Sequence, residues 1–160
     1  SVKVMDPICI DEQPINSTFI RRLTAAGDIE GVYKYLGRWP IFHGKVIHGK
    51  GLGSKLGYPT ANLMIDEEIQ LPMPGVYFGK AQVENDFYDA VANIGTSPTI
   101  GKVGMRFEVH LLQYRGNLYC KELTFYLKQR IRDEKKFSGV EDLAKQIEKD
   151  IARVSLQKKD

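Results

Sequence analysis

Residues 106–111, with the sequence RFEVHL, show the strictest alternation of apolar and polar side chains in the chain. Successive side chains of a β-strand point to opposite faces. The apolar residues from Phe107 to Leu111 therefore fall on one face, and Glu108 and His110 fall on the other. The stretch predicts a strand with one buried face and one exposed face.

Other segments on both sides of this stretch carry a similar pattern. Apolar and β-branched residues recur in short runs between glycines and prolines, and no helical pattern separates the runs. Six short strands in succession favour an antiparallel barrel or sandwich over alternating strand–helix units, and a closed barrel would leave no exposed strand edge. The predicted strands are residues 41–47, 59–64, 76–83, 88–94, 107–114 and 123–129.

The N-terminal part of the chain is predicted to be helical instead. Ser17 can cap a short helix that ends before Gly27, and Asp28 can cap a second helix that Gly37 closes. This helical pair has too little apolar surface to be stable alone, so we expect it to dock on a neighbour.

A further helix is predicted at the C-terminal end. Ser138 and Glu141 have the spacing of a capping box, and apolar residues then repeat at helical period as far as Val154. We predict two units: residues 1–40, and a main domain over residues 41–160.

The composition is that of a globular protein in a reducing compartment. Hydrophobic residues make up 42% of the 160 residues and charged residues 27%. No apolar run approaches the roughly 20 residues of a membrane-spanning helix. The two cysteines, Cys9 and Cys120, cannot form a disulfide framework, and the sequence therefore indicates a cytoplasmic protein. The net charge of +3 suits a polyanionic small molecule as well as a nucleic acid.

Residues 49–57, GKGLGSKLG, are a candidate anion-binding loop. Four glycines among nine residues leave backbone N–H groups free to approach an anion, and two lysines add charge. The segment matches neither the P-loop pattern nor the GxGxxG spacing. An ordinary loop between two strands would have the same composition.

A candidate metal site follows directly in residues 59–62, PTAN. Thr60 and Asn62 are two residues apart, so on an extended strand their side-chain oxygens point the same way. Neutral oxygens suit a magnesium ion that takes its other ligands from water and nucleotide phosphates. A turn followed by an ordinary strand is the alternative interpretation.

Several motifs together resemble those of riboflavin kinases. They occur in the family's order and extend the resemblance over about residues 41–154, with Cys120 at a position where the family usually has glycine. The motifs are LGYPTANL (56–63), PGVY (74–77), ANIG (92–95), FEVHLL (107–112), LY (118–119) and RDEKKF (132–137).

The first forty residues resemble a different part of related proteins. INSTFIR at residues 15–21 is similar to the join between the two modules of bacterial bifunctional FAD synthetases, with Asn16 in place of a serine. No HxGH-type motif of the adenylyltransferase module is present in this sequence. The resemblance implies a kinase module cut from a longer protein, with the adenylyltransferase module as its partner in cis and no FAD synthesis by this chain.

The resemblance also implies a fold, a reaction and a set of site residues. The expected fold is a six-stranded antiparallel Greek-key barrel that transfers the γ-phosphoryl group of Mg²⁺-bound ATP to the 5′-hydroxyl of riboflavin, giving FMN. The expected partners are ATP and riboflavin, without nucleic acid or membrane. The matching residues are Glu108 as general base; Thr60 and Asn62 on the metal; Gly49, Gly51, Gly53, Ser54, Lys55, Gly57, Pro59, Asn93 and Thr99 on the nucleotide; and Arg132, Glu134 and Phe137 on the flavin.

Alternatives remain open at this stage. Glu108 could be the cross-strand partner of a lysine or arginine, and residues 132–137 could be a solvated charge run that ends in a packing aromatic. The whole chain could be a non-catalytic barrel that binds flavin or nucleotide. A barrel that binds single-stranded nucleic acid is less favoured, because it would expose aromatic residues along a basic groove, whereas most of the 16 aromatic residues fall in predicted strands and helix faces.

Overall fold

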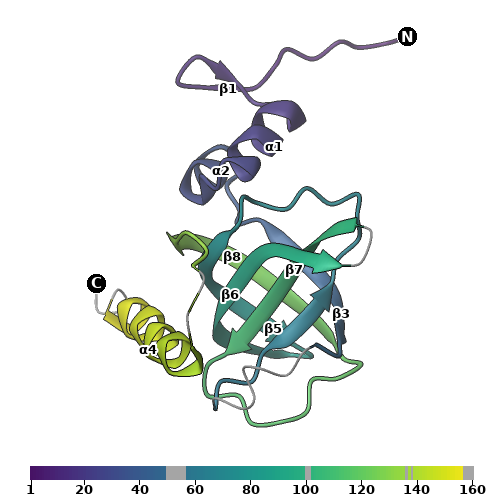
Figure 1. Ribbon diagram of the computed structural model, residues 1–160. Helices are drawn as coiled ribbons and strands as arrows, with labels where there is room; N and C mark the ends of the chain where they lie inside the picture. Colours follow the sequence, from purple (N-terminus) through teal and green to yellow (C-terminus); the bar gives the residue numbers. More distant parts are fainter. Residues whose placement is uncertain (50–56, 100–101, 136, 138, 157–160) are drawn as a thin grey trace.

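The computed structural model describes residues 1–49, 57–99, 102–135, 137 and 139–156. Within them, six strands form a closed barrel in which every neighbouring pair is antiparallel (Figure 1). The predicted barrel is therefore confirmed. In order around the barrel, the strands are β3 (Ile41–Ile47), β4 (Ala61–Met64), β7 (Lys102–Leu111), β6 (Asp86–Thr99), β5 (Gly75–Val83) and β8 (Glu122–Arg132).

The strand order is that of a Greek key. Strands β5, β6 and β7 follow one another as hairpin neighbours, while β4, which precedes them in sequence, pairs with β7 rather than β5. The connection over residues 65–74 spans the distance from β4 to β5, on the far side of this three-stranded unit.

The alternating pattern of RFEVHL determines which face of β7 is buried. Phe107, Val109 and Leu111 are 2%, 0% and 5% exposed and belong to the barrel core, as predicted. Glu108 and His110 point away from this core and are half-buried. The core cluster draws buried residues from all six strands, so the barrel interior is packed with side chains.

Strands β6 and β7 are longer than the alternation predicted. They pair from Ala90 and Leu111 as far as Thr99 and Lys102, so residues 95–99 of β6 and 102–106 of β7 form a two-stranded extension. This part of the sequence is rich in glycine, serine, threonine and proline, which is typical of turns, and only the pairing itself makes it a strand.

Two helices precede the barrel: α1 (Ser17–Ala25) and α2 (Ile29–Leu36). The predicted cap of α1 was wrong by one residue. Asn16, not Ser17, caps the helix, because its side-chain oxygen accepts a hydrogen bond from the Phe19 N–H at 2.8 Å. Gly27 and Gly37 follow the two helices at φ +74° and +66°, as their predicted terminal positions require.

The helical pair docks on the barrel, as expected from its small apolar surface. Ile29 is 2% exposed and belongs to the same core cluster as the strands, and Trp39 packs against that cluster. Figure 1 shows α1 and α2 beyond one end of the barrel. A short hairpin of β1 (Cys9–Ile10) and β2 (Gln13–Pro14), absent from the sequence-based prediction, lies before them.

The predicted C-terminal helix is confirmed as α4 (Val140–Leu156). Its proposed capping residue, Ser138, lies outside the described residues. Among the helices described, none has both the length and the apolar character that a membrane crossing needs.

Cys120, in the connection between β7 and β8, adopts a backbone conformation that favours glycine. Its φ is +63°, its side chain is exposed, and its backbone N–H donates to the Val46 carbonyl at 3.1 Å. A left-handed conformation costs an L-residue about 1–2 kcal/mol. Glycine avoids this cost, but its greater freedom in the unfolded chain cancels part of the gain in stability.

We therefore expect Cys120→Gly to raise the free energy of unfolding by about 0.5 kcal/mol, and Cys120→Val to lower it by about 1 kcal/mol. Urea denaturation measures both changes. Cys9→Gly is the matched control, since Cys9 is also exposed but has no positive φ. A loss of stability in Cys120→Gly equal to that in Cys9→Gly would contradict the assigned strain.

Candidate active site

A single row of side chains crosses the outer face of the barrel. Asn62 of β4 pairs with Glu108 of β7, and Glu108 pairs with Asn93 of β6. The row continues through Val76 of β5 to Arg132 of β8. Directly paired residues point to the same face, and their Cβ atoms lie about 5 Å apart. Four residues predicted for the metal, the proton, the nucleotide and the flavin thus share one surface.

The core fixes the outward direction of this row. Asn62, Glu108 and Asn93 each stand between two buried apolar neighbours on their own strand, so the period of two forces these polar side chains outward. Asn93 is half-buried, and its Oδ1 is buried without a hydrogen-bond partner among the described residues. An unpaired buried acceptor is costly and is typical of a site that meets a ligand.

Glu108 has an arginine neighbour on its own strand. The Nε of Arg106 lies 3.6 Å from the Glu108 Oε1, and the Arg106 Nη2 donates to Glu134 Oε1 at 3.2 Å. The first distance is too long for a hydrogen bond, and the buried Arg106 Nε has no such partner within the described part of the chain. One guanidinium is therefore shared by two carboxylates and holds Glu134 more closely than Glu108.

Gly95 lets Glu134 approach the barrel. Gly95 is the cross-strand partner of Arg106, and a Cβ at this position would collide with the Glu134 carboxylate. The missing side chain leaves room for the segment after β8 to reach the strand next to Glu108.

The PTAN segment leads into β4 at the other side of the row. Thr60 and Asn62 are half-buried, and a Cβ at Gly49 would collide with the Asn62 amide, so the start of the glycine-rich segment lies against Asn62. His110 contacts the Pro59 carbonyl through its Nδ1 at 2.8 Å. Gly57 has a φ of +80°.

Tyr58 joins this segment to the C-terminal helix. Its hydroxyl donates to Glu148 of α4 at 2.9 Å, and its ring meets the His110 ring edge-on with centroids 5.7 Å apart. The hydrogen bond to the Glu148 carboxylate raises the pKa of the Tyr58 hydroxyl above its usual value. Helix α4 therefore contacts the residue directly before the PTAN motif.

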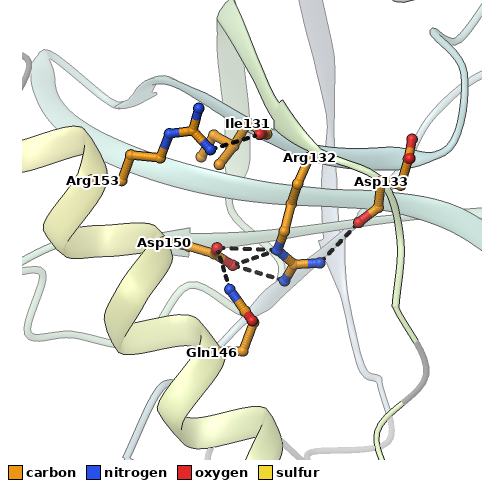
Figure 2. Close-up of polar contacts among 6 residues, drawn as sticks. All are labelled: Ile131, Arg132, Asp133, Gln146, Asp150 and Arg153. Atoms are coloured by element: carbon orange, nitrogen blue, oxygen red, sulfur yellow. Dashed lines mark hydrogen bonds and ion pairs between the residues drawn. The ribbon is translucent and has the colours of Figure 1, made fainter.

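Arg132 fastens the same helix at the β8 end of the row (Figure 2). Its Nε and Nη2 donate to both carboxylate oxygens of Asp150 at 2.7–3.1 Å, and its Nη1 donates to the Asp133 carbonyl at 2.9 Å. Gln146 donates to Asp150 as well, and Asp150 is only 4% exposed. The Phe137 ring lies 6.0 Å from the Arg132 guanidinium carbon. Arg132 thus anchors α4, and a flavin contact for it remains a prediction.

Other predicted site residues fall outside this group. Thr99 is six residues farther along β6 than Asn93, a distance of about 20 Å in an extended strand. The predicted nucleotide residues Gly51, Gly53, Ser54 and Lys55 lie outside the described residues.

The structure adds candidates that the sequence analysis did not name. Arg106 and His110 flank Glu108 on its own face of β7; the period of two predicted this face for His110, and it could have indicated it for Arg106 as well. His48 and Tyr119 form an exposed stack beside Gly49, with centroids 3.9 Å apart and planes 22° apart. Because these two residues are far apart in sequence, no local pattern predicts that they stack. The stack offers an aromatic surface to a planar base.

The oxygen atoms of Asn62 and Glu108 suit a magnesium ion that binds together with a substrate, more than a metal ion held by protein side chains alone. No group of three or more histidine, cysteine, aspartate or glutamate side chains occurs among the described residues. The row instead places the Asn62 amide beside a single carboxylate, Glu108. Magnesium is commonly bound by one or two protein oxygens together with water and substrate phosphates, so these residues fit it.

A separate cavity of about 930 Å³ lies under the connection between β4 and β5. Met64, Met73 and Met105 line it, and none of the predicted site residues does. It is therefore distinct from the row of Asn62, Glu108 and Asn93.

Comparison with known proteins agrees with the resemblance found in the sequence. The family model described as "Flavokinase: Riboflavin kinase" matches residues 36–157. Proteins named bifunctional riboflavin kinase/FMN adenylyltransferase are similar over most of the chain. Identity is 38% for the Haemophilus influenzae protein, covering 89% of this chain and 46% of the relative. It is 35% for Pseudomonas fluorescens, covering 95% and 49%, and 34% for Bacillus subtilis, covering 92% and 48%. The chain thus spans about half the length of these relatives.

Two solved structures are also similar. A Streptococcus pneumoniae protein named as a macrolide-efflux protein superposes with a TM-score of 0.85 at 32% identity, covering 91% of this chain and 48% of that one. The riboflavin kinase of Trypanosoma brucei superposes with a TM-score of 0.51 at 23% identity, covering 74% and 77%, which is a likeness of fold.

Proposed function

This chain belongs to the riboflavin kinase family, and from that premise we propose that it transfers the γ-phosphoryl group of ATP to the 5′-hydroxyl of riboflavin, giving FMN and ADP. The observation that carries this proposal is the adjacency of Asn62, Glu108 and Asn93 on three neighbouring strands. A module that only binds flavin or nucleotide has no need of a carboxylate next to neutral metal-binding oxygens.

Glu108 is the proposed general base. Phosphoryl transfer needs positioning and charge neutralisation more than covalent catalysis. As the hydroxyl oxygen bonds to the γ-phosphorus, the hydroxyl proton passes to the Glu108 carboxylate and the bond from phosphorus to the bridging oxygen of ADP breaks. A strand residue fixed by buried neighbours holds this carboxylate more firmly than a loop would, and Arg106 at 3.6 Å does not block it with a hydrogen bond.

Thr60 and Asn62 are the proposed magnesium-binding residues. The ion, when bound with ATP, neutralises charge on the phosphates. Gly49 lies against Asn62, which supports phosphate binding by the segment that Gly49 begins. In this proposal Gly49, Gly57 and Pro59 contact the nucleotide, together with Gly51, Gly53, Ser54, Lys55, Asn93 and Thr99.

The flavin is proposed to lie on the side of Glu108 away from the PTAN segment. On this side, Glu134 forms an ion pair with Arg106, and the Phe137 ring lies near the Arg132 guanidinium. Phe137 offers an aromatic face for the isoalloxazine ring, and Arg106 and Glu134 offer polar groups near the ribityl chain. A cytoplasmic location remains a prediction.

Chromatography of a reaction mixture tests the proposal. Incubation with riboflavin, ATP and Mg²⁺ should give FMN, and omission of ATP should abolish it. Riboflavin binding without FMN formation would instead identify a non-catalytic flavin barrel. Incubation with FMN and ATP is expected to give no FAD, because we propose that the adenylyltransferase activity named for the relatives belongs to the other half of their length.

Asn62→Ala is expected to raise the Mg²⁺ concentration at half-maximal activity by roughly tenfold or more, since it removes one proposed ligand. Titration of activity with Mg²⁺ at fixed ATP measures this shift. Asn85→Ala is the matched control, because Asn85 is exposed in the turn between β5 and β6. An unchanged titration in Asn62→Ala would remove Asn62 from the proposed ligands.

A further inference from the structure

We propose that His110 is a positioning residue that sets the direction of the Thr60 side chain. The inference rests on the proposed function, because it concerns the oxygens proposed to bind magnesium. His110 does not touch a reacting atom in this account. It acts through the backbone of Pro59, the residue before Thr60.

The Pro59–Thr60 peptide lies just before the first residue of β4, beyond the end of its pairing with β7. Ala61 is the first residue of β4 and pairs with Val109 of β7. The next residue of β7, His110, extends the connection with its side chain and contacts the Pro59 carbonyl at 2.8 Å. The hydrogen bond from the His110 side chain therefore takes the place of a further backbone pair, just before the first residue of β4.

This hydrogen bond can orient Thr60 because a peptide unit is planar. A carbonyl oxygen only accepts hydrogen bonds, so the His110 Nδ1 carries the proton and donates it. Holding the Pro59 oxygen holds the whole plane that contains the Thr60 nitrogen. The Thr60 Cα belongs to the same plane, so no freely rotating bond separates it from the carbonyl that His110 contacts.

The His110 ring also contacts a second residue of the same segment. The Tyr58 ring packs against it at an interplanar angle of 76°, and the Tyr58 hydroxyl donates to Glu148 of α4. Helix, tyrosine, imidazole and PTAN backbone therefore form one connected series of contacts. The imidazole is the only member of the series that lies on the same strand as the proposed base, Glu108.

Two substitutions of His110 distinguish the effect of its hydrogen bond to Pro59 from the effect of its packing against Tyr58. In His110→Asn the amide nitrogen takes a position close to that of Nδ1, whereas in His110→Gln it lies closer to that of Nε2. We expect His110→Gln to weaken binding of Mg²⁺·ADP about tenfold and His110→Asn to change it less than about twofold. Calorimetry with ADP in the presence of Mg²⁺ or of EDTA isolates the part that depends on the metal, and riboflavin affinity, measured by flavin fluorescence, should stay within about twofold in both variants.

Equal Mg²⁺·ADP affinity in the three proteins would overturn the inference. Equal losses in both variants would also overturn it, because packing and not donation would then explain them. The wild-type protein gives a second measurement that does not depend on variant folding: ¹⁵N NMR should show the His110 proton on Nδ1, and a proton on Nε2 alone would exclude the hydrogen bond. FMN formation by the wild type tests the proposed function separately.

Discussion

Glu108→Gln is expected to lower the kcat of FMN formation by roughly 10²–10⁴-fold, the usual contribution of a general base. The amide has nearly the same shape as the carboxylate but cannot accept the hydroxyl proton. The effect should fall on turnover, with the KM values for riboflavin and ATP changing little. Initial rates measured by chromatography over a range of both substrates test this expectation.

The same substitution should leave the fold intact. The ion pair between Glu108 and Arg106 is long at 3.6 Å and partly exposed, so its loss should cost at most about 1 kcal/mol. Glu122→Gln is the matched control, since Glu122 is an outward-facing strand glutamate with a partner, His43. Near-normal turnover in Glu108→Gln would assign Glu108 a structural role beside Arg106.

Asp150→Ala is expected to lower the free energy of unfolding by about 3 kcal/mol. The substitution leaves the Arg132 guanidinium, 15% exposed in its side chain, without the carboxylate that accepts from two of its nitrogens. Removing one partner of a buried ion pair costs more than the pair contributes, because the remaining charge stays desolvated. Helix α4 also loses an anchor to β8 (Figure 2).

Thermal and urea denaturation measure this loss, and Tm should fall by about 6–12 °C. Lys149→Ala is the matched control, because Lys149 is the exposed neighbour of Asp150 on the same helix. Asp150→Asn should lie between the two, since the amide retains one acceptor. A stability of Asp150→Ala equal to that of Lys149→Ala would mean that the ion pair does not hold α4 in place.

Local patterns in the sequence predicted most of the barrel. The period of two in RFEVHL placed Phe107 and Val109 in the core and Glu108 outside it, as the structure confirms. The caps at Asp28 and the glycines after α1 and α2 were also predicted from local chemistry. The cap of α1 was misplaced because Asn16 and Ser17 are both good capping residues, and only the φ and ψ of Asn16 distinguish them.

Contacts between distant segments could not be predicted in this way. Alternation puts Asn62 and Glu108 on outer faces, but only strand register puts them opposite each other. The ion pair of Arg132 with Asp150 joins β8 to α4, and no local pattern around Arg132, which was predicted to contact the flavin, indicates this partner. Likewise, the alternation predicted no strand over residues 95–99 and 102–106, and only the pairing between β6 and β7 makes them strands.

A crystal structure of the chain with riboflavin, Mg²⁺ and a non-hydrolysable ATP analogue would test the proposed roles of Glu108, Thr60 and Asn62 together. We expect the riboflavin 5′-oxygen to lie within hydrogen-bonding distance of the Glu108 carboxylate and the metal to lie on the oxygens of Thr60 and Asn62. A flavin whose 5′-hydroxyl lies away from Glu108, or a metal that contacts neither Thr60 nor Asn62, would contradict these roles.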